Sequence, residues 1–244
     1  MNERVALITG GARGIGRAVA LDLATQGWSV AICYRTSAKE ADETKAQIEK
    51  NGGRGLVAQC DVSDPGAAEG VVRQVEKEWG RIDALINGAG PYQRKNLLEV
   101  SIEDWHLMFD NNLHPLFYLG RAVAPGMKER KWGRIVSFSM ANADRLLAQP
   151  QLTAHYISKV GVLIFTRSLA RLLARHGITV NAISPGFIDS GSAPPEELES
   201  MVKKIPAGYI GETQDVVSLV RYLLSDDARY INGANVQVSG AWGI

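Results

Sequence analysis

A histidine, a tyrosine and a lysine stand close together in the run His155-Tyr156-Ile157-Ser158-Lys159. An imidazole or a phenol beside an ammonium group can deliver a proton to a developing oxyanion. In a helix, His155 would lie about 40° to one side of Lys159 and Tyr156 about 60° to the other, because each residue turns by about 100°. Both side chains then share the broad face of Lys159 but point in different directions. His155, Tyr156 and Lys159 are therefore candidate catalytic residues.

A glycine-rich loop near the N-terminus predicts a site for nucleotide phosphates. The run from Thr9 to Gly16 follows an apolar stretch and opens an amphipathic one. Glycines permit a tight turn and close approach of the backbone, and a helix N-terminus supplies free N–H groups with a partial positive charge. The candidate cofactor-binding residues of this loop are Gly10, Arg13, Gly14, Ile15 and Gly16.

Alternating strands and helices must position these residues. Short apolar runs predict seven strands, at 5–8, 29–34, 55–60, 84–87, 134–138, 179–184 and 235–238. Helices are predicted at 15–24, 38–51, 64–79 and 102–131, then from near Lys159 to 175, and at 196–203 and 213–224. Pro115 and Pro125 are expected to kink or divide the fourth helix. This order predicts an α/β protein with a single-domain Rossmann fold over residues 1–244, whose doubly wound, parallel, seven-stranded sheet carries helices on both faces.

The composition narrows the class of protein. The chain has 244 residues, 45% of them hydrophobic, and a net charge of +1, so it favours neither a nucleic acid nor a membrane surface as partner. Cys33 and Cys60 are the only cysteines and lie in apolar runs, which predicts buried thiols in a reducing compartment. With no leader peptide or membrane-length apolar run apparent, we expect a cytoplasmic enzyme. The histidines share no metal-ligand spacing, so no metal site is predicted.

The Gly-x-x-x-Gly-x-Gly spacing of the N-terminal loop resembles that of the short-chain dehydrogenase/reductase superfamily. Matches extend along nearly the whole chain. Asn87-Gly88-Ala89-Gly90 follows the fourth strand, and Asp61-Val62 follows the third. Trp105 stands seven residues before Asn112, and the segments after Lys159 and around Pro185 are in the family's register.

This resemblance implies an oxidoreductase with a nicotinamide cofactor. It assigns to cofactor binding Asp61, Val62, Asn87, Gly88, Ala89, Lys159, Pro185, Gly186 and Ile188. It implies that Lys159 lowers the pKa of a catalytic tyrosine and that Asn112 holds a water of the proton relay. The alternative for Asn112 is a helix-kink residue before Pro115, and for Lys159 a solvated surface lysine.

Two positions depart from the family's pattern. His155 stands four residues before Lys159, where the tyrosine is expected, and Met140 stands at the serine position. A thioether cannot donate a hydrogen bond, and Ser139, one residue earlier on a strand, would face the opposite side. His155 is either a replacement acid or a polar residue at a helix start. The loop between Met140 and His155 is about two residues longer than usual, and a replacement group could come from Asp144, Gln149 or Thr153.

The end of the second strand favours NADP(H) over NAD(H). An acidic residue there would bond the ribose 2′-hydroxyl and repel a 2′-phosphate. Here the strand ends in Cys33-Tyr34-Arg35-Thr36-Ser37, without an acid. Arg13 and Arg35 could face the 2′-phosphate, with Thr36 or Ser37 donating a hydroxyl. The alternative is that Arg35 is a solvated surface residue.

Two functions remain open at this point. The first is an NADPH-dependent reductase of a small carbonyl or C=N substrate with an altered catalytic acid, either Tyr156 or His155. The second is a catalytically degenerate protein that binds NADP(H) or a partner without hydride transfer. The chain looks most like 3-oxoacyl-acyl carrier protein reductases, with a weaker likeness to pteridine and dihydromonapterin reductases. The resemblance also implies a substrate lid near 189–212 and a homo-oligomer, either a tetramer or a dimer.

Overall fold

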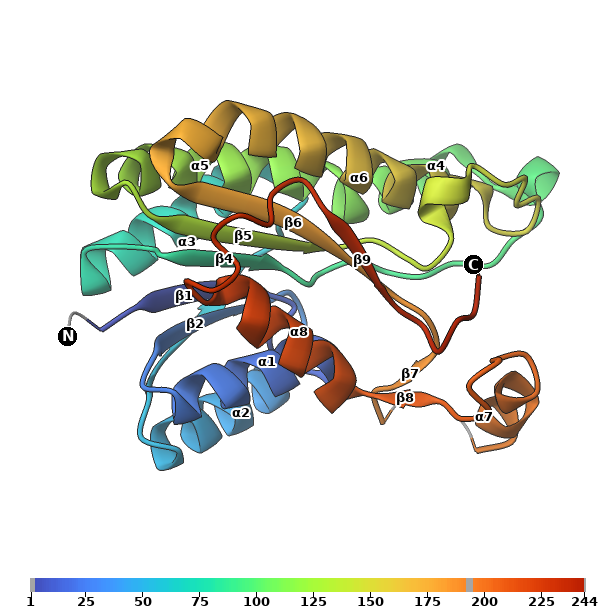
Figure 1. Cartoon of the computed structure of the whole chain (residues 1–244), viewed down its shortest axis with the longest axis horizontal. Helices are drawn as coiled ribbons and strands as arrows, with labels where there is room; N and C mark the ends of the chain where they lie inside the picture. Colours follow the sequence, from blue (N-terminus) through green and yellow to red (C-terminus); the bar gives the residue numbers. More distant parts are fainter. Residues whose placement is uncertain (1–2, 192–194, 244) are drawn as a thin grey trace.

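Seven parallel strands form the central sheet, in the order β3-β2-β1-β4-β5-β6-β9 (Figure 1). The computed structural model describes residues 3–191 and 195–243. The strands are β1 (Val5–Thr9), β2 (Ser29–Tyr34), β3 (Arg54–Gln59), β4 (Ala84–Asn87), β5 (Gly133–Phe138), β6 (Ile178–Pro185) and β9 (Asn235–Val238). The strand order reverses direction between β1 and β4, so the carboxyl ends of these two strands border the crevice where such sheets bind ligands.

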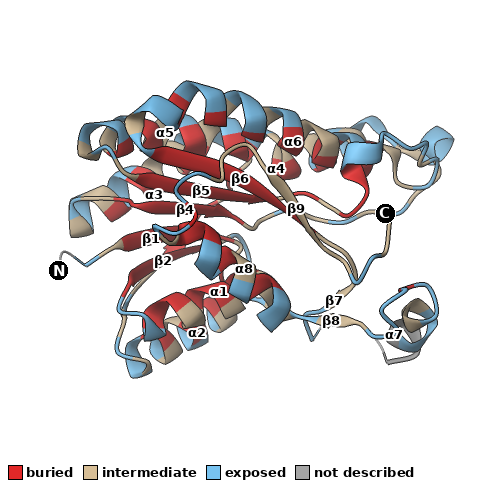
Figure 2. Cartoon of the chain, in the orientation of Figure 1, coloured by how far each residue is buried: buried red, intermediate tan, exposed pale blue. Residues whose placement is uncertain are grey.

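Helices cover both faces of the sheet, as Figure 1 shows. One face carries α1 (Gly14–Thr25), α2 (Ala38–Lys50) and α8 (Thr213–Leu224); the other carries α3 (Pro65–Trp79), α4 (Ile102–Asn112), α5 (His114–Arg130) and α6 (Thr153–Leu173). Each layer encloses its own apolar core against the sheet. Figure 2 shows the inner strands buried, the edge strand β9 only partly buried and the outer helix faces exposed. The fold class predicted from the sequence is confirmed.

The long helix predicted at 102–131 is two helices. Leu113 separates α4 from α5, and Pro115 lies in the first turn of α5, where its missing N–H costs no intrahelical hydrogen bond. Pro125 lies inside α5 without dividing it. The break places Asn111 and Asn112 at the end of α4, beside the carboxyl end of the sheet.

Three short helical turns and a second, small sheet escaped the sequence analysis. The turns are η1 (Leu97–Glu99), η2 (Ala143–Arg145) and η3 (Ala174–His176). The small sheet pairs β7 (Ile188–Asp189) with β8 (Gly211–Glu212), and α7 (Pro195–Val202) lies between them in sequence. Within the described residues, no helix combines the length and apolar character needed to cross a membrane.

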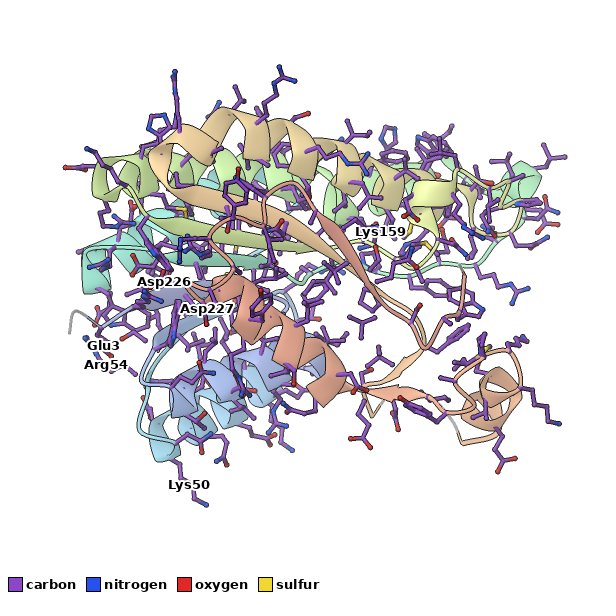
Figure 3. The ribbon with its side chains drawn as sticks, viewed as in Figure 1. Glu3, Lys50, Arg54, Lys159, Asp226 and Asp227 are labelled. Carbon is purple, nitrogen blue, oxygen red and sulfur yellow. The ribbon has the colours of Figure 1, made fainter. Side chains whose placement is uncertain are left out.

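Carboxylates tie the amino ends of the strands together. Asp83 is fully buried before β4 and accepts hydrogen bonds from Arg81 at 2.7 and 2.8 Å and from the Val5 N–H at 3.0 Å. At the same end, Asp226 accepts from Arg4 at 3.0 Å and from the Trp132 ring nitrogen at 3.0 Å. In Figure 3, Asp226 lies far from Lys159, which is near the other end of the sheet.

Candidate functional site

Two adjoining cavities open at the carboxyl ends of the strands. Their volumes are about 340 Å³ and about 830 Å³, and Gly10, Ala12, Arg13, Gly88 and Gly90 line both. The smaller one extends over the ends of β2 and β3, and the larger one extends along the start of α1 toward Phe138 and Pro185. Together they form a continuous cleft across the reversal point of the strand order.

The glycine-rich loop requires glycine for physical reasons. Gly10 has φ +67°, in the left-handed region, and a Cβ there would lie 3.0 Å from the Ala89 backbone nitrogen. A Cβ on Gly16 would lie only 2.4 Å from the Gly10 carbonyl oxygen. The first turn of α1 therefore packs directly on the loop, and Gly14, Ile15 and Gly16 face the larger cavity. The free N–H groups of a helix start lie beside this cavity, as a pyrophosphate requires.

A buried hydroxyl joins the two glycine segments. Thr9, at the end of β1, accepts hydrogen bonds through its Oγ1 from the backbone N–H groups of Gly88 and Ala89, both at 3.1 Å. Asn87, directly before them, donates to the Ser137 hydroxyl at 3.0 Å and lies in neither cavity lining. The loops after β1 and β4 thus form one rigid floor.

Two arginines border the smaller cavity at the end of β2. Arg13 donates to the Ser37 hydroxyl. Arg35 donates to Asn111 at 3.2 Å and lies 4.0 Å from the Asp61 carboxylate. The pKa of Asp61 is lowered, first by a hydrogen bond from Ser63 and less by the charge of Arg35. Both arginines have polar neighbours but remain more than half exposed, so each can reach an anion in the cavity.

The residues present fit a dinucleotide. Glycine backbone, a helix start and two cations line the two cavities. Of the cofactor-binding residues expected from the sequence, those lining the two cavities are Gly10, Arg13, Gly14, Ile15, Gly16, Arg35, Thr36, Asp61, Val62, Gly88, Ala89 and Pro185. Gly186 instead packs against Ser239, where a Cβ would lie 2.8 Å from the Ser239 Cα. Ile188 lines a separate cavity of about 340 Å³ beside Tyr209.

Lys159 is buried on α6 above the end of β5 (Figure 3). Its Nζ donates to the Phe138 carbonyl at 3.0 Å, and its own carbonyl accepts from the Ser139 hydroxyl at 2.8 Å. Burial lowers the pKa of Lys159 to about 8, because a charged ammonium is poorly solvated there. Lys159 itself lines neither cavity, but its two partners Phe138 and Ser139 line the larger one, so Lys159 lies directly behind that lining.

His155 is buried one helical turn before Lys159. Its ring packs edge-on against the ring of Tyr92, with centroids 5.2 Å apart. The pKa of His155 is lowered to about 4, first by burial and then by the charge of Lys159, while a hydrogen bond with the Pro91 backbone acts in the opposite direction. The imidazole is therefore neutral at neutral pH. Its Nδ1 has no hydrogen-bond partner within residues 3–191 and 195–243.

The Tyr156 hydroxyl is turned toward the loop between β5 and α6. It donates to the Asn142 carbonyl at 2.8 Å and accepts from the Leu147 N–H at 3.0 Å. The side chain is buried, and it belongs to neither cavity lining. The two candidate acids, His155 and Tyr156, thus point to different partners, as the 100° helical step predicts.

Asn112 and Met140 stand at the positions where the family pattern has its asparagine and its serine. Asn112 donates to the Pro91 carbonyl at 3.1 Å and to the Met108 carbonyl at 3.0 Å. Its buried Oδ1 has no partner in the described part of the chain. Met140 packs against an apolar cluster that includes Leu163. No hydroxyl therefore stands at the position where the family pattern has its serine.

The suggested replacements for that serine are engaged elsewhere. Asp144 accepts from Gln237 at 3.3 and 3.4 Å, and Thr153 donates to the Gln149 carbonyl at 2.8 Å. None of the three lines either cavity.

Pro91 and Tyr92 are site residues that the sequence analysis missed. The Pro91 carbonyl joins the Asn112 amide and the His155 ring, and Tyr92 packs on that ring. Their position directly after Asn87-Gly88-Ala89-Gly90 is the one signal that could have found them.

Comparisons with a family model, with curated proteins and with solved structures each match nearly the whole chain. The family model described as enoyl-(acyl carrier protein) reductase matches residues 10–242. A 3-oxoacyl-[acyl-carrier-protein] reductase of Synechocystis sp. is 34% identical over 241 residues, covering 98% of this chain and 97% of that protein. The FabG protein of the same name from Haemophilus influenzae is 35% identical, covering 98% of each chain. A blue fluorescent protein from a metagenomic library, crystallised with NADPH, superposes with a TM-score of 0.92 at 31% identity, covering 100% of this chain and 99% of that one.

Proposed function

The chain belongs to the short-chain dehydrogenase/reductase family of oxidoreductases, and from this we propose that it uses NADP(H) to reduce a carbonyl or C=N group with an altered proton donor. The observation that carries the proposal is the combination of a complete dinucleotide cleft with a buried lysine directly behind its lining. The cofactor, when bound, supplies a hydride. The remaining chemistry belongs to the side chains of this protein.

Cofactor binding is assigned to the floor and the rim of the cleft. The glycine loop and the start of α1 would bind the pyrophosphate. Arg13 and Arg35, with Thr36 and Ser37 between β2 and α2, would bind a 2′-phosphate. With no acid at the end of β2 to repel that phosphate, we favour NADP(H) over NAD(H).

Lys159 is the proton donor that the site supports best. A general acid works well when its pKa is near the working pH, and the pKa of Lys159 is about 8. His155 carries no extra proton at neutral pH, because its pKa is about 4. The Tyr156 proton is donated to Asn142. We therefore propose that Lys159 Nζ delivers the proton and that neither of the two acids suggested by the sequence does.

His155 and Asn112 then have positioning roles. Both hydrogen-bond to the Pro91 carbonyl, which fixes the loop after β4 against α4 and α6. His155 Nδ1 and Asn112 Oδ1 are buried acceptors without a partner among the described residues, of the kind that an ordered water satisfies.

We base our proposals for the substrate class and the assembly on the relatives in the family. The relatives are named for 3-oxoacyl groups on acyl carrier protein, so a 3-oxoacyl thioester is the first substrate to test. We propose that residues 189–212, with the β7–β8 sheet, act as the substrate lid; residues 192–194 of this range lie outside the described part of the chain. Exposed Phe117 on α5 and Ile164 and Leu172 on α6 support a homo-oligomer formed through these helices, which sedimentation can test.

A second function is favoured by one specific observation. Met140 and His155 replace both hydroxyl-bearing positions of the family pattern, so the protein would bind NADP(H) without hydride transfer. Purified protein with NADPH and a panel of 3-oxoacyl thioesters, ketones and dihydropterins distinguishes the two functions. Oxidation of NADPH that disappears in Lys159→Met supports the reductase. Calorimetric binding of NADPH with no oxidation on any panel member supports the second function.

A further inference from the structure

We propose that Tyr156 is a positioning residue that fixes the loop between β5 and α6 as one wall of the substrate site, an inference that rests on the proposed function. The Tyr156 hydroxyl bonds two residues that bracket η2: it donates to the Asn142 carbonyl at 2.8 Å and accepts from the Leu147 N–H at 3.0 Å. One phenol hydroxyl thus links the two ends of the 142–147 segment from inside the protein, and we call this pair of hydrogen bonds the Tyr156 clamp. Asn142 and the tyrosine are both buried, which makes these bonds hard for water to replace.

The closed segment has a backbone that needs such support. Asn142 has φ 62° and Leu146 has φ 54°, both in the left-handed region. Asparagine tolerates this conformation, but leucine rarely adopts it, since its Cβ crowds the backbone. The conformation therefore persists because surrounding bonds impose it. The bond to the Leu147 N–H falls directly after the strained Leu146.

The same loop is attached to the other side of the site. The carbonyls of Pro150 and Gln151 accept from the backbone N–H groups of Leu97 at 2.9 Å and Lys95 at 2.8 Å. Lys95 also pairs with Asp104 at 2.6 Å. This second segment carries Tyr92, which packs on His155. The loops after β4 and β5 therefore meet over the first turn of α6, where His155 holds one and Tyr156 holds the other.

These joined loops present large apolar side chains to solvent. Tyr92 is 63% exposed, Leu146 is 73% exposed and Leu147 is 47% exposed. Tyr92 directly follows Pro91, which lines the smaller cavity, and the loop of Leu146 and Leu147 begins at Ser139, which lines the larger one. Exposed large apolar side chains are a feature of binding surfaces. We infer that the wall held by Tyr156 receives the apolar part of the substrate, such as an acyl chain or a hydrophobic ring.

Hydrogen exchange tests the Tyr156 clamp without requiring that the protein turn over a substrate. In the wild-type protein the Leu147 N–H should be protected, although its loop is largely exposed. In Tyr156→Phe it should exchange at least about tenfold faster, the factor that corresponds to loss of about 1.4 kcal/mol. Amides of the α6 core, such as that of Leu163, should keep their protection. Tyr230→Phe, at a fully solvent-exposed tyrosine, is the matched control and should change nothing.

Kinetics test the positioning role. Tyr156→Phe should raise KM for a long-chain 3-oxoacyl thioester several-fold, leave kcat within about twofold, and leave the pH profile unchanged. A large loss of kcat with a shifted pH profile would instead make Tyr156 the acid and overturn the inference. Rapid exchange of the Leu147 N–H in the wild-type protein would overturn it as well. If the wild-type protein turns over no substrate while Leu147 behaves as expected, the proposed function fails and the Tyr156 clamp stands.

Discussion

The ammonium group of Lys159 donates a hydrogen bond to the carbonyl of Phe138, 3.0 Å away, at the last residue of β5. This contact gives the buried ammonium group one hydrogen-bond acceptor. Burial is the one cause of the pKa shift of Lys159, and it lowers this pKa to about 8. Lysine in this state holds a proton at neutral pH and releases it readily.

The first prediction is a pH limb set by Lys159. Reduction should be constant at low pH and fall about tenfold per unit above about pH 8, because only the protonated lysine donates. The dependence of kcat/KM on pH measures it. Lys159→Arg keeps the charge but should lose most activity, since guanidinium does not release its proton. His155→Gln should keep the limb; a limb that vanishes in this variant would assign the proton to His155.

The second prediction concerns restoration of the family's hydroxyls. His155→Tyr combined with Met140→Ser should raise kcat by about 100-fold, the usual contribution of a positioned general acid. Tyr92, being exposed, can move to make room for the larger ring. Met140→Ser alone should have little effect. If the wild-type protein is inactive and the double variant reduces substrate, the binding function proposed as the alternative is the correct one.

The third prediction concerns cofactor choice. Arg13→Ala and Arg35→Ala should each weaken NADPH binding about tenfold or more, because each removes a charge-assisted bond to the 2′-phosphate. NADH binding should change much less. Fluorescence titration of both cofactors measures the ratio. Arg54→Ala is the matched control, since Arg54 pairs with Glu3 away from the cleft (Figure 3). An equal loss of affinity for NADPH and NADH would mean that the two arginines do not bind the 2′-phosphate.

The fourth prediction separates backbone strain from cofactor approach. Gly10 and Gly27 have similar left-handed φ values of +67° and +78°. Alanine at either should cost about 1–2 kcal/mol of stability. Only Gly10→Ala should also abolish NADPH binding, because its Cβ would enter the narrow space beside Ala89, whereas Gly27 has nothing within 4 Å. Thermal melts and calorimetry test both parts; retained binding in Gly10→Ala would contradict the placement of the pyrophosphate.

The fifth prediction addresses the amino ends of the strands. Asp83→Ala should lower the free energy of unfolding by about 2–3 kcal/mol, since it leaves the buried Val5 N–H without an acceptor and breaks the bonds from Arg81. Asp83→Asn keeps an acceptor and should cost less. Urea denaturation measures both. Asp42→Ala, at an exposed helix position, should be neutral; equal losses in all three variants would refute the argument.

The sequence predicted the inner strands of the sheet well because they are buried on both faces. Val5–Thr9 and Ala84–Asn87 are wholly buried, and continuous apolar runs are the direct signature of that environment. The division of the helix at Leu113 was harder to place. Pro115 and Pro125 look alike in sequence, yet one lies in a first turn and the other inside a helix.

The catalytic constellation was less predictable than the cofactor loop. The glycine loop is local, so its residues and their roles are contiguous in sequence. The Tyr156 hydroxyl bonds a loop in which Leu146 adopts a left-handed backbone, and no propensity of leucine indicates that conformation. The Pro91 carbonyl is a main-chain group and leaves no side-chain signal at all. The spacing of His155 and Tyr156 correctly indicated divergent directions but not the partners at the end of each.

Thr9 has a consequence for the thermodynamics of ligand binding. Its hydroxyl holds the N–H groups of Gly88 and Ala89 in place through hydrogen bonds within the protein itself. The glycines, which lose more conformational entropy than other residues when they are ordered, are thus already ordered when the chain folds. A ligand entering this crevice meets a preorganised surface and forfeits little of its interaction energy to ordering. Folding stability and ligand affinity are therefore linked through a single hydroxyl, and a change that removes it would weaken both.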